Sequence, residues 1–183
     1  MADPADVASI DAIIRAAYDS VSGPAGTRDW NRLRLLFIPG ARLVPTTENA
    51  GAVNLGGKPQ MLDVDGFISR CAAHVANNGF FEKEIARRTE QFGCIAHAWS
   101  TYESRHNADD PKPFMRGINS IQLFYDGARW WIVSIYWQHE GPEHPVPENY
   151  LQRRVPSLPM RCTANARTSF TNLSRAAPAG SGA

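Results

Sequence analysis

Two histidines are the side chains of this sequence best suited to acid–base chemistry, because an imidazole titrates near neutral pH. His97 lies in a run of strand-forming residues, and His74 lies near the end of a helical pattern. Each also has a structural interpretation: His97 as a core histidine hydrogen-bonded to a neighbour, and His74 as a helix C-terminal histidine favoured by the helix dipole. We treat both as candidate catalytic residues.

Three further side chains could complete such a site. Asp19 could orient a histidine or a water molecule, although a solvated acid at a helix end is the simpler interpretation. Tyr18 could supply a phenol donor or pack in the core. The guanidinium of Arg116 could bind a carboxylate or an enolate oxygen, and an ion pair with Glu103 or Glu140 fits the sequence equally well.

The pattern of apolar residues predicts helices in the first half of the chain and strands in the second. Helical spacing runs through residues 7–21, recurs over residues 30–37 and returns behind an N-cap at Asp63 or Asp65. A short strand is predicted at residues 43–44. Four long strands are then predicted at residues 80–92, 94–105, 114–125 and 128–139.

The Asp126-Gly127 pair between the last two strands is the strongest short-range hairpin signal that a sequence offers. Helices that are segregated from a run of strands predict an α+β domain. We expect a cone-shaped, curved antiparallel sheet of four long strands plus one or two short ones, with three N-terminal helices covering its concave face. Both faces of the last two strands are apolar, so we expect a homodimer that packs around Trp130, Ile132 and Tyr136.

Composition bounds the domain and its partners. Residues 152–183 carry five arginines and no acidic residue, which leaves 14 basic against 18 acidic residues in the rest of the chain. We expect one domain over residues 1–151, a disordered basic tail rich in Pro, Ser, Ala and Gly over residues 152–183, and no nucleic-acid partner. A signal peptide and an 18-residue apolar run are not found, which predicts a cytoplasmic protein without a membrane partner.

Motifs for cofactors and metals are absent from the sequence. It contains no phosphate-binding glycine loop, no GxSxG and no HExxH. The remaining histidines, His106, His139 and His144, lack the spacing of a metal site. We therefore predict no cofactor and no bound metal.

The order of these elements resembles the nuclear-transport-factor-2-like (SnoaL-like) α+β cone superfamily over roughly residues 5–150. The segments that carry the resemblance are Asp29-Trp30-Asn31-Arg32-Leu33, residues 92–103 and residues 116–130. A partial likeness to the scytalone-dehydratase branch rests on Tyr18-Asp19, His74 and Phe81-Glu82. The chain has Trp99 and Ile118 where that branch has a second histidine and an asparagine, so a two-histidine dehydration mechanism does not carry over.

The resemblance implies a small-molecule pocket inside the cone. Strand alternation divides each strand into two faces, and the resemblance assigns one set of residues to the pocket. The expected substrate-binding residues are Tyr18, Trp99, Arg116, Ser120, Gln122, Trp131 and Trp137, beside the catalytic candidates His97, His74 and Asp19. The aromatic residues would make apolar walls, although a sheet core contains such residues in any case.

Members of this superfamily include enzymes and proteins without enzymatic activity. One hypothesis is a cofactor-independent isomerase, dehydratase or hydrolase that acts on an apolar, aromatic or polyketide-like molecule by histidine acid–base chemistry. The alternative is a non-catalytic module for ligand binding or dimeric assembly.

Overall fold

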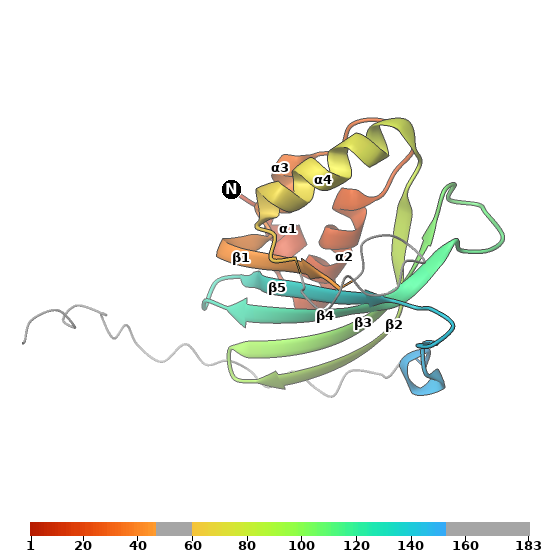
Figure 1. Ribbon diagram of the computed structural model, residues 1–183. Coiled ribbons are helices and arrows are strands. Elements are labelled where there is room, and N and C mark those ends of the chain that lie inside the picture. The colour runs from red at the N-terminus through yellow and green to blue at the C-terminus, as the bar shows by residue number, and fades with distance from the viewer. Residues whose placement is uncertain (47–59, 153–183) are drawn as a thin grey trace, which may run out of the picture.

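The structure is a computed structural model that describes residues 1–46 and 60–152 (Figure 1). The helices are α1 (Pro4–Val7), α2 (Ile10–Val21), α3 (Trp30–Arg34), α4 (Val64–Asn77) and the 3-10 helix η1 (Glu148–Tyr150). The strands are β1 (Phe37–Pro45), β2 (Phe81–Phe92), β3 (Ile95–Arg105), β4 (Met115–Tyr125) and β5 (Trp130–His139). Apart from Gln152, the predicted basic tail lies outside the described residues.

Polar side chains set the helix starts. Asp29 and Asp63 cap α3 and α4 by accepting hydrogen bonds from backbone N–H groups, which decides between the caps that the sequence left open, Thr27 or Asp29 and Asp63 or Asp65. The first predicted helix is in fact two, because the Ser9 hydroxyl caps a new start by accepting from the Ala12 N–H. α2 is therefore an independent amphipathic helix that directs Ile13, among others, toward the sheet.

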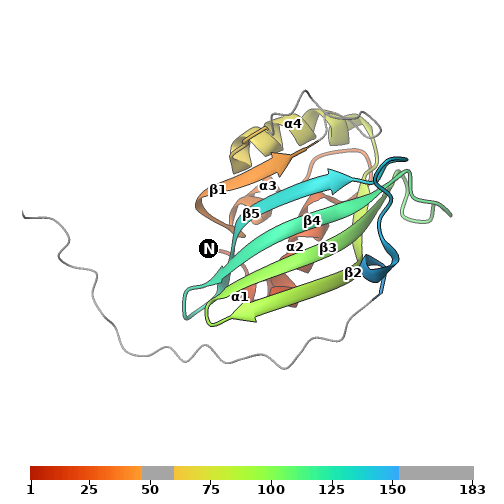
Figure 2. The same cartoon turned by 60° about the horizontal axis from the view of Figure 1, so that its bottom comes forward.

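The five strands form one curved sheet in the order β1-β5-β4-β3-β2. β2 to β5 are an antiparallel meander, as predicted, and β1 pairs with β5 in parallel. α1 to α4 lie on one face of this sheet (Figure 1), and in Figure 2 the strands stand in front of α1, α2 and α3. The predicted α+β architecture, with helices over the concave face of a curved sheet, is confirmed.

β1 is longer than the two-residue strand that the sequence predicted. It runs over Phe37–Pro45, and its register against β5 shifts between Phe37 and Arg42. Gly40 has a φ of 84° in this interval, a left-handed conformation that glycine adopts without strain. The Pro39-Gly40 pair therefore makes an irregularity inside a strand, although such a pair is also typical of a helix end.

A second irregularity decides which way β5 faces. Gln122 of β4 pairs with Ser134, whereas the next residue, Leu123, pairs with Ile132, so Val133 is an extra residue on β5. Trp130 and Ile132 are buried against the helices on one side of this bulge. The prediction that Trp130 and Ile132 contribute to a dimer surface is therefore wrong, because both side chains belong to the core.

Candidate active site in the concave face

The concave face is closed at one end and accessible at the other. Toward the start of β3 the facing residues Ile121, Leu123 and Ile132 are at most 2% exposed. Toward the end of β3 the inward-facing residues keep partial solvent exposure: Cys71 and Phe67 of α4, Glu82 of β2, Met115 of β4, and Trp137 and His139 of β5. Phe67 and Trp137 make an edge-to-face contact there, with ring centroids 6.0 Å apart.

Polar side chains gather at this accessible end, and we call them the interior polar cluster. Its members come from one helix and four strands. They are Tyr18, Glu82, Glu84, Ser100, Tyr102, Ser104, Asn119 and His139. A patch of this kind on the inner face of a sheet has to satisfy its hydrogen bonds internally.

One chain of hydrogen bonds in the cluster has a fixed direction. The Asn119 Nδ2 group can only donate, and it lies 3.0 Å from the Tyr18 hydroxyl. The Tyr18 hydroxyl lies 2.7 Å from the Ser100 Oγ, and that hydroxyl donates to the Glu84 Oε1 at 2.5 Å. Since a carboxylate only accepts, hydrogens run from Asn119 through Tyr18 and Ser100 to Glu84.

A second pair joins Tyr102 to His139. The Tyr102 hydroxyl lies 2.7 Å from the His139 Nδ1 atom, and burial lowers the pKa of His139 from 6.5. Gly117, the β4 partner of Tyr102, leaves space for the phenol, because a Cβ atom at that position would lie 2.6 Å from the Tyr102 hydroxyl. The glycine thus permits the pair to form.

Glu82 is the most perturbed carboxyl of the cluster. Burial raises its pKa from 4.5 to about 7, although hydrogen bonds from Ser104 and Asn119 act in the opposite direction. The Ser104 hydroxyl donates to the Glu82 Oε2 at 3.1 Å. Within residues 1–46 and 60–152 no Lys or Arg forms an ion pair with Glu82. A carboxyl in this environment exchanges protons near neutral pH.

Three titratable groups near Glu82, the side chains of Tyr18, Tyr102 and Cys71, remain uncharged. Burial and the charge of Glu82 raise the pKa values of Tyr18 and Tyr102, and burial raises that of Cys71 to about 12. The backbone of Glu82 is also fixed, because its N–H donates to the Ser22 hydroxyl at 2.9 Å and its carbonyl accepts from that hydroxyl at 3.0 Å. Ser22 follows α2 directly, so it fixes the end of that helix to β2.

Comparison with known proteins identifies the fold. No protein-family model and no curated protein sequence matches the chain. A Caulobacter vibrioides protein described as having a cystatin-like fold aligns with 74% of this chain and 90% of its own length, at 14% identity and a TM-score of 0.53. A putative calcium/calmodulin-dependent protein kinase II association domain from Xanthomonas campestris aligns with 73% of this chain and 86% of its own, at 10% identity and a TM-score of 0.52.

A third structure, an NTF-2-like protein of unknown function from Silicibacter pomeroyi, aligns with 73% of this chain and 94% of its own length, at 19% identity and a TM-score of 0.49. The chain shares the fold of the Caulobacter vibrioides protein, which is described as cystatin-like. At these identities the likeness concerns the fold alone, so the chemistry of the site has to be argued from its residues.

Within this fold, the structure places two predicted substrate-binding residues in the interior. Tyr18 and Trp137 face the sheet interior, where Trp137 packs against Phe67. Six other predicted site residues lie on the sheet face that points away from the helices: His97, Trp99, Arg116, Ser120, Gln122 and Trp131. The predicted choice of the inward-facing residues is therefore wrong for β3 and β4. Alternation sorts residues into two sets, but it does not say which set meets the helices.

His97 does not share a cavity with His74. The His97 Nε2 atom lies 2.9 Å from the Ser120 Oγ on the outer face, where its ring also contacts Trp99. His74 is exposed on α4, on the other side of the sheet. His97 is thus bonded to a neighbour, as the structural interpretation predicted, but on the outer face and not in the core. Arg116 likewise forms a two-pronged ion pair with Glu140, at 2.6 and 2.9 Å.

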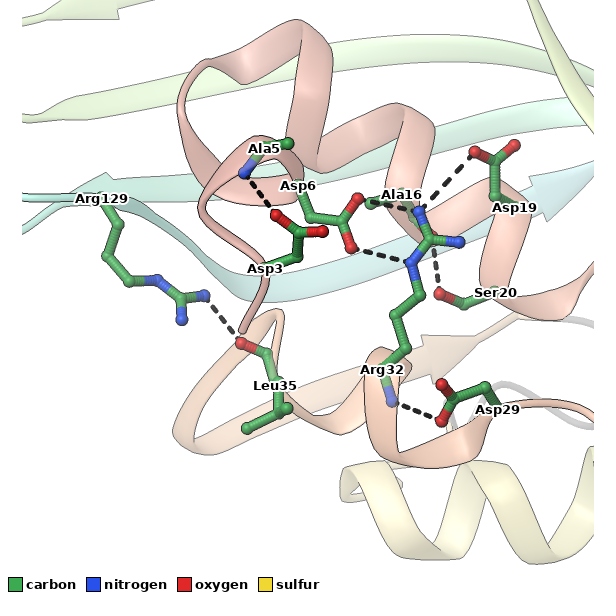
Figure 3. A network of polar contacts seen from close by, with 10 residues as sticks. All are labelled: Asp3, Ala5, Asp6, Ala16, Asp19, Ser20, Asp29, Arg32, Leu35 and Arg129. Carbon is green, nitrogen blue, oxygen red and sulfur yellow. Dashed lines mark hydrogen bonds and ion pairs between the residues drawn. The ribbon is translucent and has the colours of Figure 1, made fainter. Parts of the chain in front are cut away.

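Asp19 lies outside the interior as well. It is exposed near the end of α2, and its Oδ2 atom lies 3.9 Å from the Arg32 guanidinium (Figure 3). Arg32 binds Asp6 more closely, at 2.7 and 2.8 Å, which lowers the pKa of Asp6 and joins α1 to α3. Asp19 and Arg32 therefore belong to a contact between helices.

A surface groove of about 480 Å³ lies beside this contact. It is lined by Asp19, Ser20, residues 22–29 and Arg32. Its central side chain, Arg28, donates to the backbone carbonyls of Val21, Gly23, Pro24 and Gly26, so its hydrogen-bonding capacity is used in holding the loop. We therefore place the candidate chemistry in the interior polar cluster rather than in this groove.

Sequence reasoning missed most of the cluster. Glu82 and Glu84 suggest a charge ladder with Arg88 when the strand is read alone. A usable signal was present in β3, where Ser100 and Ser104 flank Tyr102 at alternate positions of one strand face. The part of the chain that the structure describes contains no group of three or more His, Cys, Asp or Glu residues that could hold a metal ion.

Proposed function

We propose that this protein binds a small, largely apolar molecule in the accessible end of its concave face and catalyses a cofactor-independent proton transfer there. The reactions that fit are an isomerisation, an elimination of water or a hydrolysis. Glu82 acts as the general acid–base group. The observation that carries the proposal is a carboxyl with a pKa of about 7 on an inward face that stays partly accessible to solvent.

Glu82, rather than His97 or His74, is the proposed general acid–base group for a physical reason. A general acid–base group works best when its pKa lies near the working pH and when it can reach the substrate. Burial of Glu82 against Tyr18 and Tyr102 supplies the first condition, and the partial exposure of Glu82 supplies the second. His97 faces outward and His74 is exposed, so neither can reach a molecule bound under the helices.

The surrounding residues divide the remaining tasks. Phe67 and Trp137 form an apolar wall for the body of the ligand. Ser104 and Asn119 stabilise the charged form of Glu82 by hydrogen bonding. Without them its pKa would rise further, and less of the base would be available at pH 7.

The test compares the wild-type protein with Glu82→Gln and with Glu90→Gln, a control on the same strand whose side chain is exposed. Enones, epoxides and hydroxylated aromatic compounds are screened for turnover. The Glu82 variant should lose about two to four orders of magnitude in rate, and the control should not. Undiminished turnover by Glu82→Gln would refute the assignment of Glu82. A bell-shaped or sigmoidal rate profile centred near pH 7 should accompany activity.

We also propose that two copies associate through the sheet face opposite the helices. Trp99, Val133 and Tyr136 expose 40, 37 and 48% of their surface on this face, an apolar area that a partner would cover. η1 covers a neighbouring area, because the Tyr150 carbonyl accepts from the Thr101 hydroxyl at 2.6 Å.

None of the described helices is long and apolar enough to cross a membrane.

Sedimentation at micromolar concentration should give about twice the 20.2 kDa mass of one chain. Tyr136→Glu, which places a charge in the middle of the proposed interface, should give the single-chain mass. A wild-type protein that sediments as one chain would exclude this assembly.

A further inference from the structure

The hydrogen atoms of the interior polar cluster are largely committed to protein acceptors. The Ser104 hydroxyl donates to Glu82 and the Ser100 hydroxyl donates to Glu84. The Tyr18 hydroxyl donates to Ser100. The Asn119 amide donates to Tyr18 and also forms a hydrogen bond with Glu82. A ligand that needs hydrogen-bond donors from these residues would have to break an existing bond.

Acceptor capacity, in contrast, remains. A carboxylate offers about four lone-pair positions, and the described contacts of the Glu82 side chain are with two donors, Ser104 and Asn119. Glu82 is partly exposed as a residue, and the neighbouring inward-facing residues Cys71, Met115 and His139 are as well, so we place the ligand at this end of the sheet. In its ionised form, Glu82 therefore presents an acceptor to a bound molecule, whereas the donors of the cluster that were named above are already in use.

The charges near the cluster also favour a hydrogen-bond donor over an anionic group. Glu82 and Glu84 are both carboxyl groups, and the arginines nearest to them already have acidic partners. Arg116 is paired with Glu140 on the outer face, and Arg87 is paired with Asp11 and Glu84. An anionic ligand group beside Glu82 would meet two carboxyl groups, and no described Lys or Arg forms an ion pair with Glu82, which is unfavourable in a poorly solvated site.

We propose that the ligand of this site carries an uncharged or cationic hydrogen-bond donor, an alcohol or an amine, that binds to the Glu82 carboxylate, and that carboxylates and phosphates are excluded. This inference rests on the proposed function only in placing the ligand beside Glu82. It narrows the substrate class, because acceptor-only ketones and anionic acids are disfavoured relative to alcohols and amines of the same shape.

The test uses four probes that share one phenyl-substituted skeleton: 1-phenylethanol, 1-phenylethylamine, acetophenone and 2-phenylpropanoate. Binding is followed at millimolar concentrations through the NMR signals of the Trp137 indole and the Asn119 amide. The alcohol and the amine should bind at least about tenfold more tightly than the carboxylate, which corresponds to about 1.4 kcal/mol. The affinity of the ketone should lie between that of the alcohol and that of the carboxylate.

Glu82→Gln gives the sharpest outcome, because its amide adds two donors and removes the charge. The order of affinities should then change, with the ketone and the carboxylate gaining relative to the alcohol and the amine. Glu90→Gln, on the same strand and exposed, should keep the wild-type order. A carboxylate that binds wild type as tightly as the alcohol, or four probes that fail to bind at all, would overturn the inference.

The amine adds a dependence on pH. Tyr18 of α2, Cys71 of α4 and Tyr102 of β3 face Glu82 and have raised pKa values, so they stay neutral below pH 9. His139 of β5 has a lowered pKa and is neutral above pH 7. Amine affinity should therefore rise between pH 6 and 8 as Glu82 ionises, and a flat profile would count against the ion pair.

Failure of this inference can be told apart from failure of the proposed function. If donor probes are preferred but Glu82→Gln leaves turnover intact, the ligand class stands and the catalytic role falls. If turnover depends on Glu82 but ketones or acids bind best, the catalytic role stands and the ligand class falls.

Discussion

Replacing Glu82 with glutamine should make the free energy of unfolding depend less on pH. A folded-state pKa of about 7, against the ordinary value of 4.5, means that the folded protein holds this proton more tightly than the unfolded chain does. The free energy of unfolding therefore falls as the pH rises from about 4.5 to about 7. The difference between the two pKa values corresponds to about 3 kcal/mol.

Glutamine is uncharged at every pH, so Glu82→Gln removes this contribution. Relative to the variant, the wild-type protein should lose about 3 kcal/mol of unfolding free energy between pH 4.5 and pH 8. At pH 4.5 the two proteins should be similar, since a protonated carboxyl resembles an amide in size. At pH 8 the variant should be the more stable protein.

Urea unfolding of the wild type, Glu82→Gln and Glu90→Gln at half-unit pH steps measures this difference. Glu90 lies on the same strand and is exposed, so its variant should run parallel to the wild type. Parallel curves for wild type and Glu82→Gln would refute the assignment of a neutral-range pKa to Glu82, and the proposed acid–base role with it.

Three further predictions concern other parts of the fold. Burial lowers the pKa of His139, so its stabilising contribution is present above pH 6.5 and is lost as the pH falls, and His139→Gln should flatten this acid-side loss in urea titrations. Gly117→Ala should lower the free energy of unfolding by about 1–3 kcal/mol, because the new Cβ would lie 2.4 Å from the Gln138 carbonyl oxygen. The control Gly141→Ala, with open space around its Cβ, should change the free energy of unfolding by less than about 0.5 kcal/mol. Val133→Lys should shift the sedimenting species toward single chains, as Tyr136→Glu does, if the outer face is the dimer surface.

Local pattern was sufficient for most of the architecture. Asp29 and Asp63 cap their helices because a short polar side chain before an apolar stripe satisfies free N–H groups wherever the helix lies. Asp126-Gly127 closes the last hairpin, with Gly127 at a φ of 99°, because that turn needs a residue that tolerates a positive φ. These features depend on neighbours in the chain, so the order of helices and long strands could be predicted.

The candidate site depended on contacts between distant segments. Alternation correctly separated His97 and Ser120 from Ser100 and Asn119, but the choice of the inner set was made by α2, whose Tyr18 hydroxyl bonds to Ser100 and Asn119. A one-residue change of face exchanges every inward side chain for an outward one.

What the sequence by itself determined about this protein is therefore its elements, their order and the α+β architecture, because capping, turn chemistry and hydrophobic periodicity act over a few residues. What only the tertiary structure decided is which strand face lies under the helices, where β5 changes face at Val133, and that Glu82 sits among uncharged groups. The pKa of a carboxyl depends on how much water and which charges surround it in three dimensions, and those surroundings come from segments far apart in the sequence.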